Sequence, residues 1–327
     1  MACNEVGQVA SPDAHLRTTV TVIHDLNDIP AALRGGAVTI GNFDGVHLGH
    51  VRIIERLVAK ARQVGGAAVV FTFDPPPVRL LRPLEAPAPL SWMARKAALL
   101  AELGVDAVIA FPTTREFLQL SAREFFDWVI MDRLSARAVV EGANFFFGRD
   151  RSGDIQTLAQ FCAQANIALE VVPPVVAEGE VVSSSRIRRL VASGQVRPAA
   201  RLLTRPYRLR GQVIRGAGRG KHLGFPTANL DGISTLIPAE GIYAGRVAIG
   251  DRLLPAAISL GPNPTFDDGQ RKVEVHVLDF DGWLYDRELE VDFVDRLRDI
   301  QRYASVDELL VQMHRDVAAT RQLAATG

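Results

Sequence analysis

Cysteine is scarce in this sequence. Cys3 and Cys162 are the only two among 327 residues, which is too few for a disulfide framework. Neither lies in the spacing of a cysteine-based metal site. The scarcity argues against a disulfide-stapled scaffold and fits a protein of the reducing cytoplasm.

An excess of charge of one sign is also missing. The 37 Lys and Arg residues are balanced by 37 Asp and Glu residues. A protein whose main partner is a nucleic acid or an anionic membrane usually carries a large positive field. We therefore expect neither partner, although local basic clusters could still bind small phosphates.

Long apolar runs are absent as well. No run reaches the roughly 18 residues that a membrane-spanning helix needs. The first residues include Glu5, Asp13 and Arg17 without an apolar stretch, so no secretory signal is expected there. Residues 1–17 are predicted to form a loose tail, and the protein is expected to be cytoplasmic.

What the first half does contain is an alternation of short apolar runs with helical patterns. The predicted strands are residues 38–43, 67–73, 106–111, 136–141 and 169–173. The predicted helices are residues 50–63, 92–103 with Ser91 as N-cap, 122–131 and 155–165. Such alternation predicts a Rossmann-like parallel sheet with helices on both faces, which binds ligands at the carboxyl ends of its strands.

The pattern changes near residue 200, after a helix end and linker predicted at residues 201–206. Short alternating runs separated by Gly, Pro and Asp follow at residues 207–214, 241–249, 253–260, 272–279 and 287–293. They predict an antiparallel barrel or sandwich. A capping box at Ser305 and Glu308 then starts a final amphipathic helix. We therefore predict an α/β domain over residues 18–203 and a mostly β domain over residues 204–327.

The loop "NFDGVHLGH" joins the first long predicted strand to the helix that follows. A helix N-terminus offers free N–H groups and the positive end of the helix dipole, and both favour phosphate. Gly45 and Gly49 permit close backbone approach, while His47 and His50 could donate to phosphoryl oxygens. From the pattern alone, a structural turn with incidental histidines remains the alternative.

Two further segments of the first half suit a phosphate site. Ser183 or Ser184 is a good N-cap for a helix over residues 187–192, and Arg188 would suit a triphosphate. An ordinary capped helix with a surface arginine is the alternative. Asn144 follows another predicted strand and should share a rim with His47, whereas residues 145–147, three phenylalanines, are expected to pack in the core.

In the second half, "RGAGRGKHLG" at residues 215–224 is rich in glycine but is not a P-loop. The P-loop pattern fails at Arg215 and His222, and a dinucleotide-binding glycine pattern fails at Lys221. A glycine-rich flap over phosphates remains plausible.

Thr227 and Asn229 follow the glycine-rich segment. They lie two residues apart, so on an extended segment they share a face, and their oxygens suit Mg²⁺. A turn with polar residues is the alternative. Glu274 alternates with apolar valines on a predicted strand and could accept a hydroxyl proton near a metal-bound phosphate. An exposed strand glutamate is the plain alternative, and His276 competes for the role.

Five motifs in order resemble those of the bacterial bifunctional riboflavin kinase/FMN adenylyltransferase (FAD synthetase) family. They are "GNFDGVHLGH" with its HxGH histidines, "EGANFFFG", "VSSSRIR", "GKHLGFPTANL" and "VEVHVLDFDGWLYDRELEVDF". Each motif alone is modest, but five in order across two domains are highly specific, and the resemblance spans about residues 20 to 323. The resemblance implies an α/β nucleotidyltransferase domain followed by an antiparallel β-barrel riboflavin kinase domain with a C-terminal helix.

The resemblance also implies the chemistry. ATP would phosphorylate riboflavin to FMN, and a second ATP would adenylylate FMN to FAD, with Mg²⁺ and release of pyrophosphate. The implied catalytic residues are Glu274 in the kinase and His47, His50, Asn144 and Arg188 in the adenylyltransferase. The implied nucleotide contacts are Asn42, Phe43, Asp44, Gly45, Gly49, Ser184, Ser185, Gly218, Gly220, Lys221, Pro226, Thr227 and Asn229, with Thr227 and Asn229 also at the metal.

The sequence departs from the family pattern at a few positions. Pro76 stands where the family usually has His, and the flap has Ala217 and His222 where acidic and Thr residues are common. A riboflavin kinase whose adenylyltransferase domain is slow or inactive is therefore the nearest alternative. A nucleotidyltransferase for another phosphate-bearing substrate and a non-catalytic flavin- or nucleotide-binding module are the others.

Overall fold

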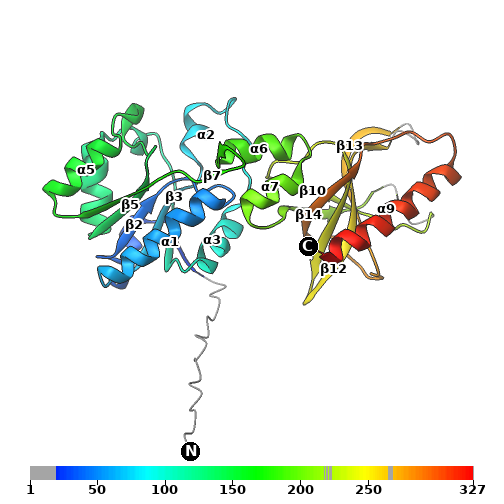
Figure 1. The fold of residues 1–327 in the computed structure, drawn as a ribbon, viewed down its shortest axis with the longest axis horizontal. Coiled ribbons are helices and arrows are strands. Elements are labelled where there is room, and N and C mark those ends of the chain that lie inside the picture. Colours follow the sequence, from blue (N-terminus) through cyan, green and yellow to red (C-terminus); the bar gives the residue numbers. More distant parts are fainter. Residues whose placement is uncertain (1–19, 217, 219, 221–222, 264–267, 327) are drawn as a thin grey trace, which may run out of the picture.

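A computed structural model describes residues 20–216, 218, 220, 223–263 and 268–326. The predicted N-terminal tail lies outside these residues. Figure 1 shows an α/β body and a β-barrel side by side along the long axis, with helices α6 (Ser184–Ala192) and α7 (Val196–Leu203) between them.

The α/β body is built on a six-stranded sheet of order β1-β4-β3-β2-β5-β6, in which every pairing is parallel. The strands are β1 (Thr21–Ile23), β2 (Ala37–Ile40), β3 (Ala68–Phe73), β4 (Ala107–Phe111), β5 (Ala138–Gly142) and β6 (Ala168–Val172). The chain proceeds from β2 outward to β3 and β4 and later resumes on the other side of β2 with β5. The carboxyl ends of β2 and β5 therefore form a topological switch point, where open α/β sheets bind ligands.

Helices cover both faces of this sheet, as predicted. α1 (Leu48–Gln63) and α3 (Met93–Glu102) pack on the face of Val70 and Val108. α5 (Ile155–Gln164) and the π-helical turn at Phe126–Arg133 pack on the opposite face. The sheet strands are apolar on both faces because both are buried.

Shorter elements complete this body. They are 3₁₀ turns at Leu26–Asp28, Ala31–Leu33, Phe117–Gln119 and Arg149–Arg151, helices α2 (Pro77–Leu81) and α4 (Ala122–Phe125), and the hairpin β7 (Val176–Ala177) and β8 (Glu180–Val181).

Some local predictions were wrong. Edge strand β1 was not predicted, because three residues are too few to show a period. The helix predicted over residues 122–131 begins as α4 but continues to Arg133 in π geometry. Trp92, rather than Ser91, is the N-cap of α3, because the Ser91 hydroxyl is committed to Asp44 and Gly45.

The second body is a closed six-stranded antiparallel barrel, which decides between the predicted barrel and sandwich. Its strands are β9 (Tyr207–Ile214), β10 (Ala228–Asp231), β11 (Gly241–Ile249), β12 (Arg252–Asn263), β13 (Asp268–Val277) and β14 (Glu288–Arg298). β10 was not predicted as a strand because it is short and half polar.

Helix α9 (Val306–Thr326) closes the chain against the barrel. The Ser305 hydroxyl accepts from the Glu308 N–H at 3.2 Å, as the predicted capping box requires, but the Glu308 carboxylate accepts from Ala304 instead of Ser305. Asp316 of α9 forms a bidentate ion pair with Arg298 of β14, with distances of 2.7 to 3.1 Å. This pair fastens the helix over the barrel.

The two bodies share one hydrophobic cluster. Ile187 and Leu202 of α6 and α7 belong to the same buried cluster as Tyr207 and Phe293 of the barrel. The predicted linker is therefore packed: α7 ends at Leu203, followed by Thr204 with a left-handed backbone. Two further contacts join the bodies. The Leu236 N–H donates to the Pro89 carbonyl at 2.9 Å, and the Arg210 guanidinium lies over the Trp92 ring at 4.7 Å from its centroid.

Candidate active sites

A large pocket lies at the switch point between β2 and β5, with a volume of about 970 Å³. The β2–α1 loop contributes Asn42 and Phe43 to its wall, the first turn of α1 contributes His50, the segment after β5 contributes Asn144, and the start of α6 contributes Ser184. Segments from residues 42 to 184 thus converge on the rim that the sequence predicted.

The β2–α1 loop has a strained backbone. Phe43 and Val46 have φ angles of 46° and 44°, a left-handed conformation that is costly for bulky and β-branched residues. Gly45 has a φ of 80°, and a Cβ there would press against Leu90 and Leu203 at 3.1 Å. Such a loop keeps its shape only when its surroundings hold it.

Asp44 is the residue whose contacts hold the β2–α1 loop in place. Its buried carboxylate accepts from the backbone N–H groups of Leu90 and Ser91 at 2.9 to 3.1 Å and forms an ion pair with Arg188 of α6. Arg188 also donates to the carbonyl of Ala88 at 3.0 Å, and Ser184 donates to the Asp44 carbonyl at 3.0 Å. Asp44 therefore ties together three segments that are far apart in the sequence.

The two histidines form a stacked pair, with ring centroids 3.7 Å apart and an angle of 17° between the rings. His47 is the N-cap of α1, and its Nδ1 accepts from Gly49 N–H at 3.2 Å, so the neutral ring carries its proton on Nε2. The Nδ1 of His50 is buried and has no hydrogen-bond partner among the described residues.

Both rings are neutral near pH 7. Burial lowers the pKa of His47 to about 4, against the opposing influence of Asp44. Burial also lowers the pKa of His50 well below its usual value, and the positive charges of protonated His47 and of Lys96 add to this effect. The stacked rings therefore do not repel each other, and His50, which lines the pocket, can donate an N–H group to a phosphoryl oxygen.

The predicted residues of this half fall into two layers. Asn42, Phe43, His50, Asn144 and Ser184 line the pocket. The others lie behind or beside the wall: His47, Asp44, Gly45, Gly49, Ser185 and Arg188. Arg188 in particular is directed to Asp44 and Ala88, so a direct contact with a triphosphate would require it to exchange these partners.

The three phenylalanines after Asn144 behave differently from one another. Phe147 is buried in the core, as predicted. Phe146 is 45% exposed, lines the pocket and lies under the guanidinium of Arg151 at 4.3 Å, so the prediction of core packing is wrong for it.

Three buried polar residues at this site were not predicted. Glu141 at the end of β5 accepts from the Ile40 N–H of β2 at 2.6 Å, and burial raises its pKa well above the usual value. Lys96 of α3 and Thr72 of β3 lie beneath the β2–α1 loop. The available signal was a charged residue on an otherwise apolar strand or helix face, at Glu141 and Lys96.

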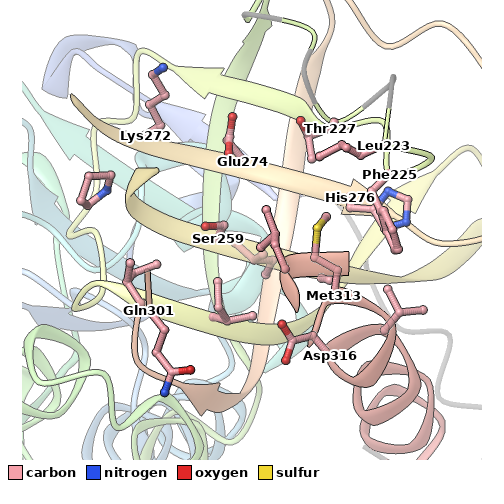
Figure 2. Close-up of a pocket in the computed structure, with 18 of the residues that line it drawn as sticks. Leu223, Phe225, Thr227, Ser259, Lys272, Glu274, His276, Gln301, Met313 and Asp316 are labelled. Carbon is pink, nitrogen blue, oxygen red and sulfur yellow. The ribbon is translucent and has the colours of Figure 1, made fainter. Parts of the chain in front are cut away.

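The second site lies in the barrel, where Figure 2 shows Glu274, Thr227, Lys272 and Ser259 in one pocket, with Met313 and Asp316 of α9 toward its other side. Strand register explains the grouping, since Glu274 of β13 is paired with Asn229 of β10 on one side and Ser259 of β12 on the other. The predicted alternation on β13 is confirmed: Val273, Val275 and Val277 are buried, whereas Glu274 and His276 line the pocket.

The glycine-rich segment contacts the two predicted metal ligands. A Cβ on Gly216 would overlap the Asn229 amide, and one on Gly220 would overlap the Phe225 carbonyl and lie 3.4 Å from Thr227 Oγ1. Gly218 and Gly220 line the pocket, while Lys221 lies outside the described residues. Side chains at residues 216 and 220 would fill the space beside Thr227 and Asn229.

The His276 side chain contacts the segment that contains Pro226 and Thr227. The His276 ring Nδ1 lies 2.8 Å from the Pro226 carbonyl, and its ring packs edge-on against Phe225. Because a carbonyl only accepts, Nδ1 carries the proton here. His276 thus holds the segment that presents Thr227.

The described residues contain no cluster of three or more His, Cys, Asp and Glu side chains that could hold a metal ion alone. The hydroxyl of Thr227, the amide of Asn229 and the carboxylate of Glu274 instead form a set of hard oxygen donors. Such a set fits a divalent ion that takes its remaining ligands from phosphates and water. Among the helices of the described part of the chain, none is long and apolar enough to cross a membrane.

Fold and sites together define a two-domain transferase: an HxGH nucleotidyltransferase sheet joined to a kinase barrel. Residues 29–186 match the family model described as FAD synthetase, and residues 203–324 match the one described as riboflavin kinase. The chain belongs to the bifunctional riboflavin kinase/FMN adenylyltransferase family, as the motifs predicted. Enzymes of these two kinds use ATP, generally with a divalent metal.

Individual relatives agree along nearly the whole chain. The bifunctional riboflavin kinase/FMN adenylyltransferase of Pseudomonas fluorescens is 38% identical over 305 residues, which cover 93% of this chain and 98% of that protein. The enzyme of the same name from Escherichia coli K12 is 33% identical, covering 92% and 96%. A crystal structure named as a macrolide-efflux protein from Streptococcus pneumoniae is 31% identical, with a TM-score of 0.82 over 92% of this chain and 98% of that one. The two-domain fold is therefore shared.

Proposed function

We propose that the chain makes FMN in its barrel and FAD in its α/β domain, using ATP and Mg²⁺ for both steps. The observation that carries the proposal is that each domain brings its own motif residues into one pocket: Asn42, His50 and Asn144 at the switch point, and Asn229 and Glu274 across the barrel strands.

In the barrel, the Glu274 carboxylate would accept the proton of the ribityl 5′-hydroxyl as that oxygen attacks the γ-phosphorus of ATP. The new O–P bond forms as the bond to the bridging β–γ oxygen breaks, and ADP leaves. Thr227 and Asn229 would hold Mg²⁺, which neutralises the charge of the phosphates when bound. The apolar side chains of Leu309, Met313 and Val317 on α9 line the same pocket and would receive the flavin ring.

In the α/β domain, an oxygen of the FMN phosphate would attack the α-phosphorus of ATP. The bond to the bridging α–β oxygen breaks, and pyrophosphate leaves. A phosphate oxygen is already a nucleophile, so the site needs no strong base. His47, His50 and Asn144 would orient the phosphates and stabilise the developing charge, with Arg188 acting through Asp44 and the loop.

Domain limits and location complete the proposal. We place the boundary between the two activities at residues 203 and 204, supported by the end of α7 at Leu203 and by the start of the second family match there. We place the enzyme in the cytoplasm, where ATP is available and a free buried thiol such as Cys162 stays reduced.

A time course tests the proposal. Purified protein is incubated with riboflavin, ATP and Mg²⁺, and a parallel reaction receives FMN instead of riboflavin. We expect FMN and then FAD in the first reaction and FAD in the second. FMN without FAD would leave a riboflavin kinase with an inactive first domain. This outcome bears on Pro76, the N-cap residue of α2, which directly precedes Pro77 in the pocket wall.

A further inference from the structure

Lys96 is a buried cation that the proposed mechanism does not use. It lies on the inner face of α3 with only 5% of its surface exposed, beneath the β2–α1 loop. Its ammonium group donates to Thr72 Oγ1 at 3.4 Å, and the Thr72 hydroxyl donates to the Asn42 carbonyl at 3.3 Å. The side chain thus reaches the loop through a single buried hydroxyl.

This ammonium group has few partners for its charge. Thr72 is its only hydrogen-bond partner among the described residues, and no described carboxylate lies within ion-pair distance. Asp44, the nearest buried acid of the loop, is committed to Arg188, and Asp74 is exposed at the end of β3. A buried ammonium is retained in an apolar core only where its charge has a use or a partner.

We propose that Lys96 is a positioning residue of the adenylyl-transfer site, which anchors Asn42 and places a positive charge behind the two histidines. This inference rests on the proposed formation of FAD. Because the group is shielded from water, its field reaches the phosphates in the pocket with less screening than that of a surface lysine.

The same charge acts on His50. The charged and titratable groups around this ring are His47 on its own helix, Lys96 of α3 and, further out, Asp44 of the loop and Arg188 of α6. Burial is the largest cause of the lowered pKa of His50, and the charge of Lys96 adds to it. Removing the charge should therefore raise that pKa.

Three substitutions separate the contributions of the charge, the hydrogen bond and the volume. Lys96→Met keeps the volume without charge or donor, Lys96→Gln keeps a donor, and Lys96→Arg keeps the charge. Lys60→Met is the matched control, since Lys60 is a largely buried lysine of α1 paired with Glu170 at 3.4 Å, outside the pocket wall. FMN adenylylation is measured from pH 5 to 9 with FMN and ATP, and riboflavin phosphorylation by the same preparation reports on folding.

We expect Lys96→Met and Lys96→Gln to lose about tenfold or more in kcat/KM for FMN adenylylation. Their activity should also fall at a higher pH on the acid side than that of the unsubstituted enzyme. Lys96→Arg should recover part of the loss, Lys60→Met should match the unsubstituted enzyme, and the kinase rate should not change.

Several outcomes would overturn the inference. They are unchanged adenylylation and pH profile in Lys96→Met, recovery by Gln but not by Arg, or an equal loss of both activities, which would make Lys96 a structural residue only. If the unsubstituted protein makes no FAD, the proposed function itself fails, and that result is distinct from a variant that behaves like the unsubstituted enzyme.

Discussion

The two sites of this molecule are built on opposite plans. In the α/β site, the charged groups Asp44, Arg188 and Lys96 lie behind the pocket wall and shape a strained loop. In the barrel site, Glu274 and Asn229 stand on neighbouring strands and face the pocket directly. The chemistry accounts for the difference, because FMN phosphate needs orientation only, whereas a ribityl hydroxyl must also lose a proton.

The largest effect is expected at the Glu274 carboxylate of the barrel site. Glu274→Gln keeps the shape and removes the proton acceptor, so riboflavin phosphorylation should fall by roughly 10²- to 10⁴-fold. FMN adenylylation by the same protein should remain. Product analysis with riboflavin or FMN as the starting flavin measures both rates. A variant that phosphorylates riboflavin normally would transfer the role to another group, with His276 the first to examine.

The second-largest effect is expected at the largely buried ion pair between Asp44 and Arg188 in the α/β site. Asp44→Asn leaves Arg188 without its carboxylate, and breaking such a largely buried pair costs about 3 kcal/mol of stability. Because Asp44 holds the loop, FMN adenylylation should fall while riboflavin phosphorylation is largely kept. Urea unfolding and both activity assays measure the result.

The control for this change is Glu55→Gln, which breaks the exposed Arg52–Glu55 pair on α1. An exposed pair contributes at most about 1 kcal/mol, so both activities and the unfolding midpoint should stay near those of the unsubstituted enzyme. Equal behaviour of the two variants would show that the contacts of Asp44 do not stabilise the β2–α1 loop.

A third change sharpens the comparison from the barrel side. Gly216→Ala would push a Cβ into the Asn229 amide, so the KM for ATP in riboflavin phosphorylation should rise severalfold while adenylylation is unchanged. Gly250→Ala is the control, because it changes a β11–β12 turn glycine that has a positive φ of 58° but no neighbour within 4 Å of a Cβ. If both variants behave alike, the close approach to Asn229 does not explain the need for glycine at residue 216.

Whether a residue lines a pocket or lies behind its wall also explains what the sequence could and could not predict. Period and turn signals were sufficient for the parallel sheet, the barrel strands and the final helix. Strand ends and alternation placed Asn144 at a sheet rim and Glu274 on a strand face, but only the resemblance of their motifs to the family predicted that they are site residues. Lys96 and Glu141 were missed because their role depends on contacts between residues 24 to 101 positions apart, which no local pattern contains. The inward direction of Arg188 was hidden for the same reason.

The smallest effect concerns the pH dependence of stability, to which His47 and Glu141, two buried groups of the α/β site, contribute in opposite directions. The pKa of His47 is lowered to about 4 in the folded protein, so the unfolded chain binds the additional proton and stability is lost as pH falls from about 6.5 toward 4. The pKa of Glu141 is raised in the folded protein, so this group costs stability as pH rises above about 4.5. The two slopes partly cancel between pH 4.5 and 6.5, and only the Glu141 cost continues above that range. Glu141→Gln, which keeps the shape and an acceptor for the Ile40 N–H, should therefore stabilise the α/β domain more at pH 8 than at pH 5. Thermal unfolding at the two pH values measures the difference, and an equal shift at both would show that Glu141 ionises in the folded protein as it does in the unfolded chain.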